Sequence, residues 1–317
     1  MEITLYAGSA VPALAQKVAG LLGMRLGNPS LEHFPDGEVH VNLQESVRGR
    51  DVYVIQSTCP PVNENIMELL VLLDACRRAA AKRVTAIVPY FGYARQEKKS
   101  QGREPITARL VADILTAAGA ERILTVEIHS PAIQGFFNIE MDNLTATPLL
   151  VEYLRRFSRD RLIVVAPDAG RVKMAEKFAR ALDLPLGVLV KSRLRGTEVE
   201  MKQVIGEVAG RKAIIVDDMI STGGTIGRAV EALEGAGARP GAIVVAVHPL
   251  LVGDAVARLN RAGVADLVVT DSVPLGPEKV AGLQAKVHVQ SIAALLADTI
   301  RCLSEDLPIS PLYGPTA

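Results

Sequence analysis

Short apolar runs recur along this chain of 317 residues, and segments with helical spacing of apolar positions separate them. The runs are almost continuously apolar, which is typical of parallel strands covered on both faces. The sequence therefore predicts strands over Ile3–Tyr6, Val52–Gln56, Val84–Val88, Ile123–Ile128, Leu162–Ala166, Leu186–Val190, Ala213–Val216, Ile243–Val247 and Leu267–Thr270. Helices are predicted over Asn65–Ala79, Pro105–Ala118, Val172–Leu182 and Asp254–Ala262, and a further helix begins near Ile226.

Alternating strands and helices predict an α/β protein built on doubly wound sheets, and the chain has enough elements for two. A length of 317 residues also favours two domains over one core. Each side of Thr145–Pro148 has its own strands and crossover helices, so we expect one domain over residues 1–146 and another over residues 147–317. The extreme C-terminus, Pro308–Ala317, is expected to fray or to pack on a neighbour such as the N-terminal domain.

The amino-acid composition limits the kinds of core and of binding partner that the chain can have. Hydrophobic residues make up 49% of the chain and aromatics only 4%, so the core is expected to consist of aliphatic side chains in tight α/β layers. The 35 basic and 35 acidic residues give no net charge, which argues against nucleic acid or an anionic membrane as a partner. Zero net charge with positive mean hydropathy leaves apolar surface for another subunit to cover, so we expect a homo-oligomer.

The cysteines and the N-terminus predict a cytoplasmic protein. Cys59, Cys76 and Cys302 have neither metal-ligand spacing nor an even count for a disulfide framework, so they are interpreted as reduced thiols. No basic leader precedes a long apolar segment, and no apolar run is long enough to span a bilayer.

Residues 213–225 are the most informative stretch for function. An apolar run ends in Asp217 and Asp218, passes through Ser221–Thr225 and enters a helical pattern. Backbone N–H groups and hydroxyls at a helix N-terminus suit a phosphate, and carboxylates suit sugar hydroxyls beside it. An ordinary turn and helix cap would use the same residue types. Two adjacent acids favour a pocket for a phosphorylated sugar, because buried like charges need cations or hydroxyls as partners.

Ligands of α/β sheets lie beyond the carboxyl ends of the strands. The residues that follow the other apolar runs suit a polyphosphate and a metal ion: Arg95, Gln96, Lys98, Lys99, His129, Asp168, Lys191 and Arg193. Each also has a structural interpretation, as a strand-end histidine bonded to backbone, a turn aspartate or a solvated charged edge. Neither a Walker-type nucleotide motif nor a dinucleotide-binding glycine motif is present.

On these residues the chain resembles the ribose-phosphate pyrophosphokinases (phosphoribosyl pyrophosphate synthetases), a family related to phosphoribosyltransferases. The matching stretches lie in both halves of the chain: 34–38, 45–49, 61–70, 89–96, 103–108, 133–137, 167–170 and 217–225. The resemblance implies two phosphoribosyltransferase-like domains, each a mostly parallel sheet flanked by helices. ATP would bind the N-terminal domain and ribose 5-phosphate the C-terminal one.

The resemblance also implies the reaction. The pyrophosphoryl group of ATP would be transferred to the anomeric hydroxyl of ribose 5-phosphate, giving 5-phosphoribosyl 1-diphosphate and AMP for nucleotide, histidine and tryptophan biosynthesis. Mg²⁺ would be the cofactor, and a homohexamer activated by phosphate and inhibited by nucleoside diphosphate would be the assembly. The alternatives are a catalytically silent, synthetase-like regulatory partner and a phosphoribosyltransferase that consumes the same sugar pyrophosphate.

Site residues follow from the same resemblance. Nucleotide binding is assigned to Phe34 and Arg95, which would sandwich the adenine, and to Asp36, Gly37, Glu38 and Gln96. Mg²⁺ is assigned to His129 and Asp168. Lys191 and Arg193, on a lid over residues 191–202, would act on the polyphosphate during transfer. Ribose 5-phosphate is assigned to Arg193, Asp217, Asp218, Ser221, Thr222, Gly223, Gly224 and Thr225.

The chain departs from the family pattern at four positions. Glu127 stands where the family usually has aspartate, Arg171 where it has a second glycine, Ala132 where it commonly has glutamine, and Ser221 where it has an acid. Ser221 removes any base role at its position, yet we expect activity to survive because hydroxyl and N–H donors hold the sugar phosphate. Arg171 is expected to add a cation near the metal side.

Overall fold

The computed structural model describes residues 2–158, 160–193 and 200–313 of the chain. By internal contacts the chain divides into two compact units. Unit 1 consists of Met1–Ala146, Ser272–Pro274 and Ser291–Ala317, and unit 2 of Thr147–Asp271 and Leu275–Gln290. No helix of the described residues has both the length and the apolar character needed to cross a membrane.

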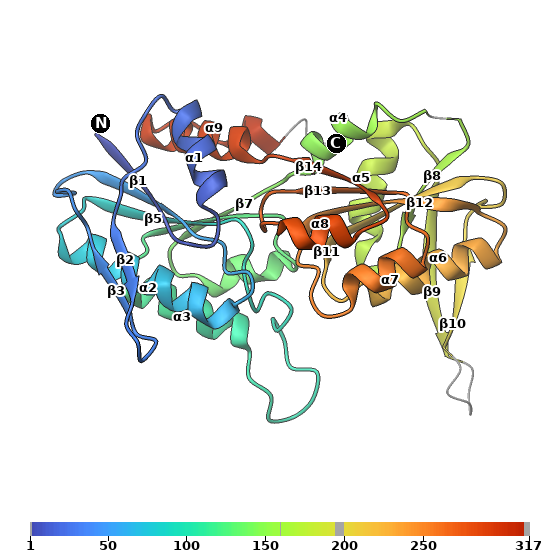
Figure 1. The fold of residues 1–317 in the computed structure, drawn as a ribbon, viewed down its shortest axis with the longest axis horizontal. Helices are drawn as coiled ribbons and strands as arrows, with labels where there is room; N and C mark the ends of the chain where they lie inside the picture. The colour runs from blue at the N-terminus through green and yellow to red at the C-terminus, as the bar shows by residue number, and fades with distance from the viewer. Residues whose placement is uncertain (1, 159, 194–199, 314–317) are drawn as a thin grey trace. The chain divides into compact units, whose positions relative to one another are not determined.

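Unit 1 is built on a parallel sheet of five strands in the order β1-β4-β5-β6-β7 (Figure 1). The strands are β1 (Ile3–Ala7), β4 (Asp51–Ile55), β5 (Arg83–Val88), β6 (Arg122–Val126) and β7 (Glu140–Leu144). One face is covered by α2 (Val62–Arg78) and α3 (Thr107–Ala118), the other by α1 (Pro12–Leu21) and α9 (Ala293–Ser304). A short 3₁₀ turn, Pro131–Phe136, joins β6 to β7.

The core of unit 1 follows from the apolar pattern. Every residue of β4 is buried, which fits a parallel strand covered on both faces. Helix α2 buries one stripe at helical spacing, formed by Ile66, Leu69, Leu72, Leu73 and Cys76. Outside this sheet, β2 (Ser30–His33) and β3 (Val39–Asn42) form an antiparallel hairpin whose tip is residues 34–38.

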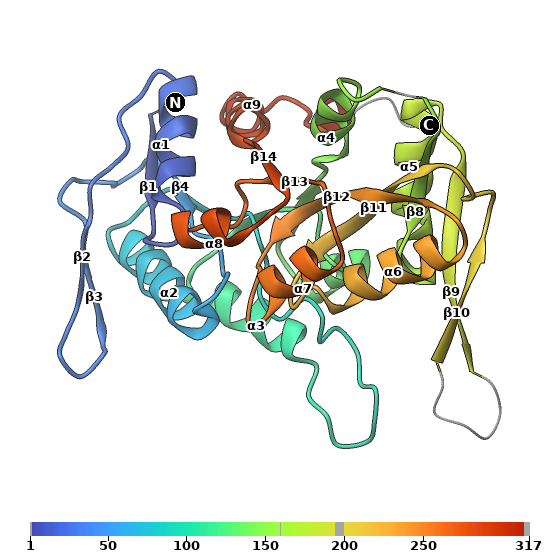
Figure 2. The same ribbon diagram turned by 45° about the vertical axis from the view of Figure 1, so that its right-hand side comes forward.

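Unit 2 is built on seven strands in the order β10-β9-β8-β11-β12-β13-β14, of which β10 is antiparallel to β9 and the other pairs are parallel. The strands are β8 (Leu162–Ala166), β9 (Leu186–Arg193), β10 (Glu200–Ile205), β11 (Lys212–Ile220), β12 (Arg239–Pro249), β13 (Asp266–Thr270) and β14 (Lys286–Gln290). The helices are α4 (Thr147–Leu154), α5 (Val172–Leu182), α6 (Gly224–Gly235), α7 (Ala255–Arg261) and α8 (Pro277–Gly282). Helices α6 and α7 lie side by side on the face opposite α5 (Figure 2).

The described C-terminal residues 291–313, which the sequence analysis assigns to the second domain except for a returning tail, belong to unit 1 by their contacts. Helix α9 packs against α1, where the Arg301 guanidinium donates a hydrogen bond to the Leu21 carbonyl over 3.2 Å. Ser57 fixes the short segment 272–274 to the same unit, because its hydroxyl donates to the Ser272 carbonyl over 2.7 Å. These contacts are non-local, so periodicity along the chain does not reveal them.

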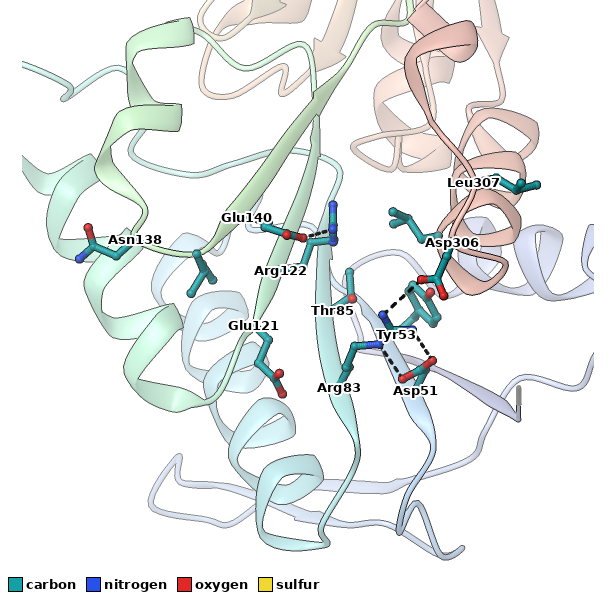
Figure 3. Close-up of a pocket in the computed structure, with 12 residues that line it drawn as sticks. Asp51, Tyr53, Arg83, Thr85, Glu121, Arg122, Asn138, Glu140, Asp306 and Leu307 are labelled. Carbon is teal, nitrogen blue, oxygen red and sulfur yellow. Dashed lines mark hydrogen bonds and ion pairs between the residues drawn. The ribbon is translucent and has the colours of Figure 1, made fainter.

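A pocket of about 630 Å³ lies at the amino ends of β4, β5, β6 and β7 (Figure 3). Ligands of such sheets bind at the opposite, carboxyl edge. The Arg83 guanidinium donates two hydrogen bonds to the buried Asp51 carboxylate, at 2.9 and 2.7 Å, and lies 3.6 Å from Asp306. Arg122 pairs in the same way with Asp142 and Glu140. The strand ends are thus tied together by ion pairs, and the C-terminal end of α9 is tied to them.

Replacing Asp51 with asparagine is expected to lower stability in a pH-dependent way. The hydrogen bond from Arg83 holds the pKa of Asp51 below its usual range, so the contribution is present near neutral pH and is lost as pH falls through the folded-state pKa. Because the Arg83 side chain is 41% exposed, we expect a loss of only about 1–2 kcal/mol. The Tm of D51N should lie below that of the parent at pH 7, and the gap should narrow below about pH 4.

Asp74→Asn is the matched control, since Asp74 also has a lowered pKa, from Arg78 and Arg77, but pairs with them on the exposed side of α2. It should cost no more than about 0.5 kcal/mol. An equal loss in both variants, or a gap for D51N that stays constant with pH, would contradict the assignment.

Candidate functional site

Asp217 and Asp218 lie buried on β11, the central strand of unit 2, with exposed fractions of 8% and 2%. Arg171 pairs with both from the 3₁₀ turn Ala169–Arg171 that follows β8. The Arg171 Nε lies 3.2 Å from Asp217 Oδ1, and its Nη2 lies 3.2 Å from Asp218 Oδ1. The sequence analysis expects Arg171 to add a cation near the metal side; the structure shows that its guanidinium, from the turn that also contains Asp168, pairs with Asp217 and Asp218. Strand β8 neighbours β11, so the turn after β8 directs the side chain to the acidic pair.

Burial raises the pKa of Asp217 well above its ordinary value, and hydrogen bonding and charge from Asp218 raise it further. The Arg171 guanidinium opposes this rise. With both acids ionised, the three groups carry a net charge of −1. The pair therefore holds a proton more readily than an isolated carboxyl, and a donor such as a sugar hydroxyl would stabilise its charged form.

The segment Ser221–Thr225 leads from this pair through a short loop into the first turn of α6, so that the acids and the segment belong to one strand–loop–helix unit. Gly223 has a left-handed φ of 73°, and a Cβ there would lie 3.2 Å from the Ala255 carbonyl oxygen, so the position requires glycine. Helix α6 begins at Gly224, and its first N–H groups have no intrahelical acceptors. Such a terminus binds an anion well.

The two candidate metal ligands follow β8 and β6. Asp168 is partly exposed, and its Oδ1 accepts a hydrogen bond from Gly170 N over 2.9 Å, which makes it a turn-capping residue as well as a candidate ligand. His129 is partly exposed and lies just beyond β6. The described residues contain no cluster of three or more His, Cys, Asp or Glu that would hold a metal by themselves.

Glu127 explains why β6 ends at Val126 and not at Ile128 as predicted. Its φ is +44°, which breaks the strand, and its Oε2 accepts hydrogen bonds from Thr145 Oγ1 at 2.9 Å and Ala146 N at 3.1 Å. Glu127 thus ties the segment before His129 to the last residues of the N-terminal stretch of unit 1. A longer acid is suited to this reach.

The candidate nucleotide residues fall into two groups. Phe34, Asp36, Gly37 and Glu38 form the exposed tip of the β2–β3 hairpin, where the Phe34 ring stacks on His40 at 5.5 Å between centroids. Arg95 and Gln96 are exposed in the turn after β5, where Gln96 accepts a hydrogen bond from the Thr107 hydroxyl at 2.6 Å. The described contacts include none between Phe34 and Arg95, and the adenine sandwich stays a prediction.

A buried polar network that the sequence analysis missed supports the second group. Thr58 Oγ1 accepts a hydrogen bond from Gly92 N at 2.6 Å and donates one to the Tyr90 carbonyl at 2.9 Å. Gly92 packs so closely that a Cβ would lie 2.6 Å from the Thr58 carbonyl oxygen. The Asn65 side-chain amide donates a hydrogen bond to the Cys59 carbonyl at 2.8 Å. The only sequence signal was a polar pair, Ser57 and Thr58, directly after an apolar strand.

Lys191 and Arg193 lie at the end of β9, in register with Lys202 and Glu200 of β10. Their side chains, and residues 194–199 of the predicted lid, lie outside the described residues. The structure therefore places the backbone of these two cations at the carboxyl end of β9. That is the edge at which the acidic pair and Asp168 also lie, since β8, β9 and β11 are parallel.

Known families match both units. The model for the N-terminal domain of ribose phosphate pyrophosphokinase matches residues 3–119, and the model for the phosphoribosyl transferase domain matches residues 143–258. The chain is therefore an α/β protein with phosphoribosyltransferase-type domains, each with a parallel or mostly parallel sheet flanked by helices, as the sequence predicts.

Relatives that match along almost the whole chain identify the family within the phosphoribosyltransferase-type proteins. Ribose-phosphate pyrophosphokinases of Caldanaerobacter subterraneus and Vibrio parahaemolyticus are each 44% identical, over 98% and 99% of this chain and the same shares of their own. The crystal structure of phosphoribosylpyrophosphate synthetase from Mycobacterium smegmatis matches with a TM-score of 0.90 and 43% identity, over 96% of this chain and 100% of that one. The chain belongs to the ribose-phosphate pyrophosphokinase family.

Asp217→Asn is expected to stabilise the protein at neutral pH. A folded-state pKa above the unfolded value means that the wild type loses stability as pH rises from about 4 through the folded pKa. Asparagine does not ionise, so the Tm advantage of D217N should grow with pH over that window and reach a few degrees, at roughly 2–4 °C per kcal/mol. Thermal melts from pH 5 to pH 8 measure this difference in Tm.

Glu176→Gln, which removes an exposed helical ion pair with Arg180, is the control and should change the Tm little at any pH. A lower Tm for D217N throughout would show that the ion pair with Arg171 outweighs burial.

Thr58→Val is expected to weaken nucleotide binding without affecting the sugar site. Valine keeps the volume but leaves the buried Gly92 N–H without its acceptor, at a cost of roughly 1–3 kcal/mol, so the turn bearing Arg95 shifts. Steady-state kinetics should show KM for ATP raised several-fold with KM for ribose 5-phosphate unchanged. Thr125→Val is the control, because Thr125 Oγ1 is buried with no hydrogen-bond partner. Equal effects of both variants would refute the positioning role.

Proposed function

We propose that this chain carries out the reaction of its family with the residues placed above. The pyrophosphoryl group of ATP is transferred to the anomeric hydroxyl of ribose 5-phosphate, which gives 5-phosphoribosyl 1-diphosphate and AMP. Unit 1 binds the nucleotide through the 34–38 hairpin tip and Arg95–Gln96. Unit 2 binds the sugar phosphate through the acidic pair and Ser221–Thr225.

The single observation that carries the sugar assignment is the joining of the buried acidic pair to the α6 N-terminus by one loop. The N–H groups of Thr222–Thr225 and the hydroxyls of Ser221, Thr222 and Thr225 would hold the 5-phosphate. Asp217 and Asp218 would accept hydrogen bonds from the ribose hydroxyls. These hydrogen bonds would offset the cost of desolvating the two buried carboxylates. Serine at 221 leaves this set of donors complete.

Pyrophosphoryl transfer needs alignment and neutralisation of charge more than covalent help from the protein. Lys191 and Arg193 would neutralise the charge that develops on the transferred group, and Arg193 would also contact the sugar phosphate. Arg171 plays a different part, since its ion pairs keep the acidic pair oriented. A lid formed by residues 191–202 would exclude water, which would otherwise accept the phosphoryl group in place of the sugar.

Mg²⁺ is the proposed cofactor, and the donor set fits it. Magnesium keeps several waters and phosphate oxygens as ligands, so one or two protein groups suffice. The Asp168 carboxylate uses only Oδ1 in its turn, which leaves Oδ2 for the ion or its water, and His129 would bind a water of the same shell. When bound, the ion would neutralise the polyphosphate and orient it for in-line attack.

We also propose that the protein is a homo-oligomer, with a hexamer as the family resemblance implies. Phe34 is 45% exposed at a hairpin tip, and among the described rings it stacks only on His40. A large exposed aromatic on a projecting hairpin suits a surface that another copy completes.

An assay for AMP release tests the proposed activity. Purified protein should release AMP from ATP only when ribose 5-phosphate and Mg²⁺ are both present, with or without inorganic phosphate as an activator. Tight binding of both substrates without AMP release would instead favour a silent regulatory partner. Pyrophosphate release that depends on a nucleobase would favour a phosphoribosyltransferase.

Lys191→Ala should lower kcat by several powers of ten, on the order of 4 kcal/mol or more, with little change in substrate affinity. A charge that interacts with the transferred group only in the transition state affects turnover and not ground-state binding. Lys177→Ala removes an exposed lysine of α5 and is the matched control. Weakened binding with unaltered turnover in K191A would refute the transition-state role.

A further inference from the structure

A groove of about 590 Å³ lies between α6 and α7 on the helical face of unit 2. Arg228 comes from α6, and Arg258 and Arg261 come from α7, while Gly227 and Val230 form part of its lining. Figure 2 shows these two helices side by side. None of the three arginines belongs to the site assigned above.

Two of the guanidinium groups converge on one point. A Cβ added at Gly224 would lie 3.2 Å from Nη1 of Arg258 and 3.4 Å from Nη1 of Arg228. A side chain at Gly224 would therefore occupy the place where both cations meet. Two guanidinium groups around one point repel each other, and an anion placed between them would remove that repulsion.

The described residues supply little compensation. Arg258 reaches Asp254 only at 3.9 Å, and that carboxylate is 80% exposed. Within the described part of the chain, Arg228 and Arg261 have no carboxylate within ion-pair distance. The lining of the groove thus has three arginines and two glutamates, with one weak ion pair to Asp254, so the end of the groove at Arg228 and Arg258 has an excess of positive charge.

The lining also limits the size of that anion. Guanidinium groups bind phosphoryl oxygens in a bidentate way, and two of them suit one phosphoryl or pyrophosphoryl group. Glu231 and Glu234 line the same groove further along α6, where they would repel an extended polyanion such as nucleic acid. The volume lies within the range of small-molecule sites.

We propose that the α6–α7 groove is a second anion site, which binds a phosphorylated small molecule with its phosphoryl group between Arg228 and Arg258. The groove shares Gly223 and Gly224 with the Ser221–Thr225 phosphate loop and continues beyond it to Gly227 and Val230, about one and two helical turns past Gly223. The proposed site therefore adjoins that loop and extends away from it along α6. Binding there does not depend on the proposed reaction.

Calorimetric titration of the full-length protein with inorganic pyrophosphate tests the proposal. The wild type is compared with the double variant Arg228→Gln/Arg261→Gln. Any pyrophosphate sites elsewhere on the chain are present in both proteins. Arg258 is left intact, because its Nη1 donates to the Thr222 carbonyl at 3.4 Å and its loss would disturb the phosphate loop. The double variant should lose one site per chain, or bind there at least tenfold more weakly.

Gly227→Leu tests the same site without removing a charge. A Cβ at Gly227 meets nothing within 4 Å, and leucine is a good helix former, so the variant should fold and fill the groove. It should also lose the site, whereas Arg239→Gln, which removes an exposed charge at the start of β12, should retain it.

Unchanged isotherms in the double variant and G227L would overturn the proposal. So would a loss in only one of them, because an effect of charge alone indicates diffuse attraction and an effect of bulk alone indicates no role for the arginines. AMP release measured on the same preparations separates this outcome from the proposed function, since its absence in every protein, wild type included, would refute the reaction and leave the groove result standing.

Discussion

The structure of unit 2 depends on how two adjacent carboxylates are accommodated inside it. Asp217 and Asp218 lie on the central strand of a sheet whose neighbours are apolar, and one guanidinium, from Arg171, reaches both. One guanidinium neutralises only one of two ionised carboxylates, so these three groups keep a negative charge when both acids are ionised. A packed apolar strand would be more stable at this place. On the proposed assignment, the hydroxyl groups of a bound sugar would donate hydrogen bonds to this pair and stabilise its charged form.

Much of the fold could be predicted because buried parallel strands are nearly continuous apolar runs. All nine predicted strands exist, and β11 extends beyond its predicted end at Val216, so that both acids lie inside the strand. The sequence also indicated that these acids need a cation. It could not identify Arg171 as that cation, since the direction of a side chain from a turn depends on which strands are neighbours. That order is a property of the sheet and not of local spacing.

The elements that were missed are short, polar or held by distant contacts. Strands β2, β3, β7, β10 and β14 contain four to six residues each and many polar side chains, so they lack an apolar run. The end of β6 depends on the left-handed φ of Glu127, which the hydrogen bonds to Thr145 and Ala146 hold in place. Helix α9 joins unit 1 through α1, almost the whole chain away. Pattern reading along the sequence has no access to such pairings.

The two groups of candidate nucleotide residues differ in how firmly they are held, and this has a consequence for recognition. The turn with Arg95 and Gln96 stands on buried hydrogen bonds from Thr58, and Gly92 lets it approach closely. The hairpin tip with Phe34 is exposed and its ring contacts only His40 among the described aromatic rings. A rigid group lowers the entropy lost on binding, whereas an exposed one must be ordered by the ligand or by another chain. On the proposed assignment, the turn would set the position of the nucleotide, and the hairpin would contribute its stacking energy only once the ligand or another chain has ordered it.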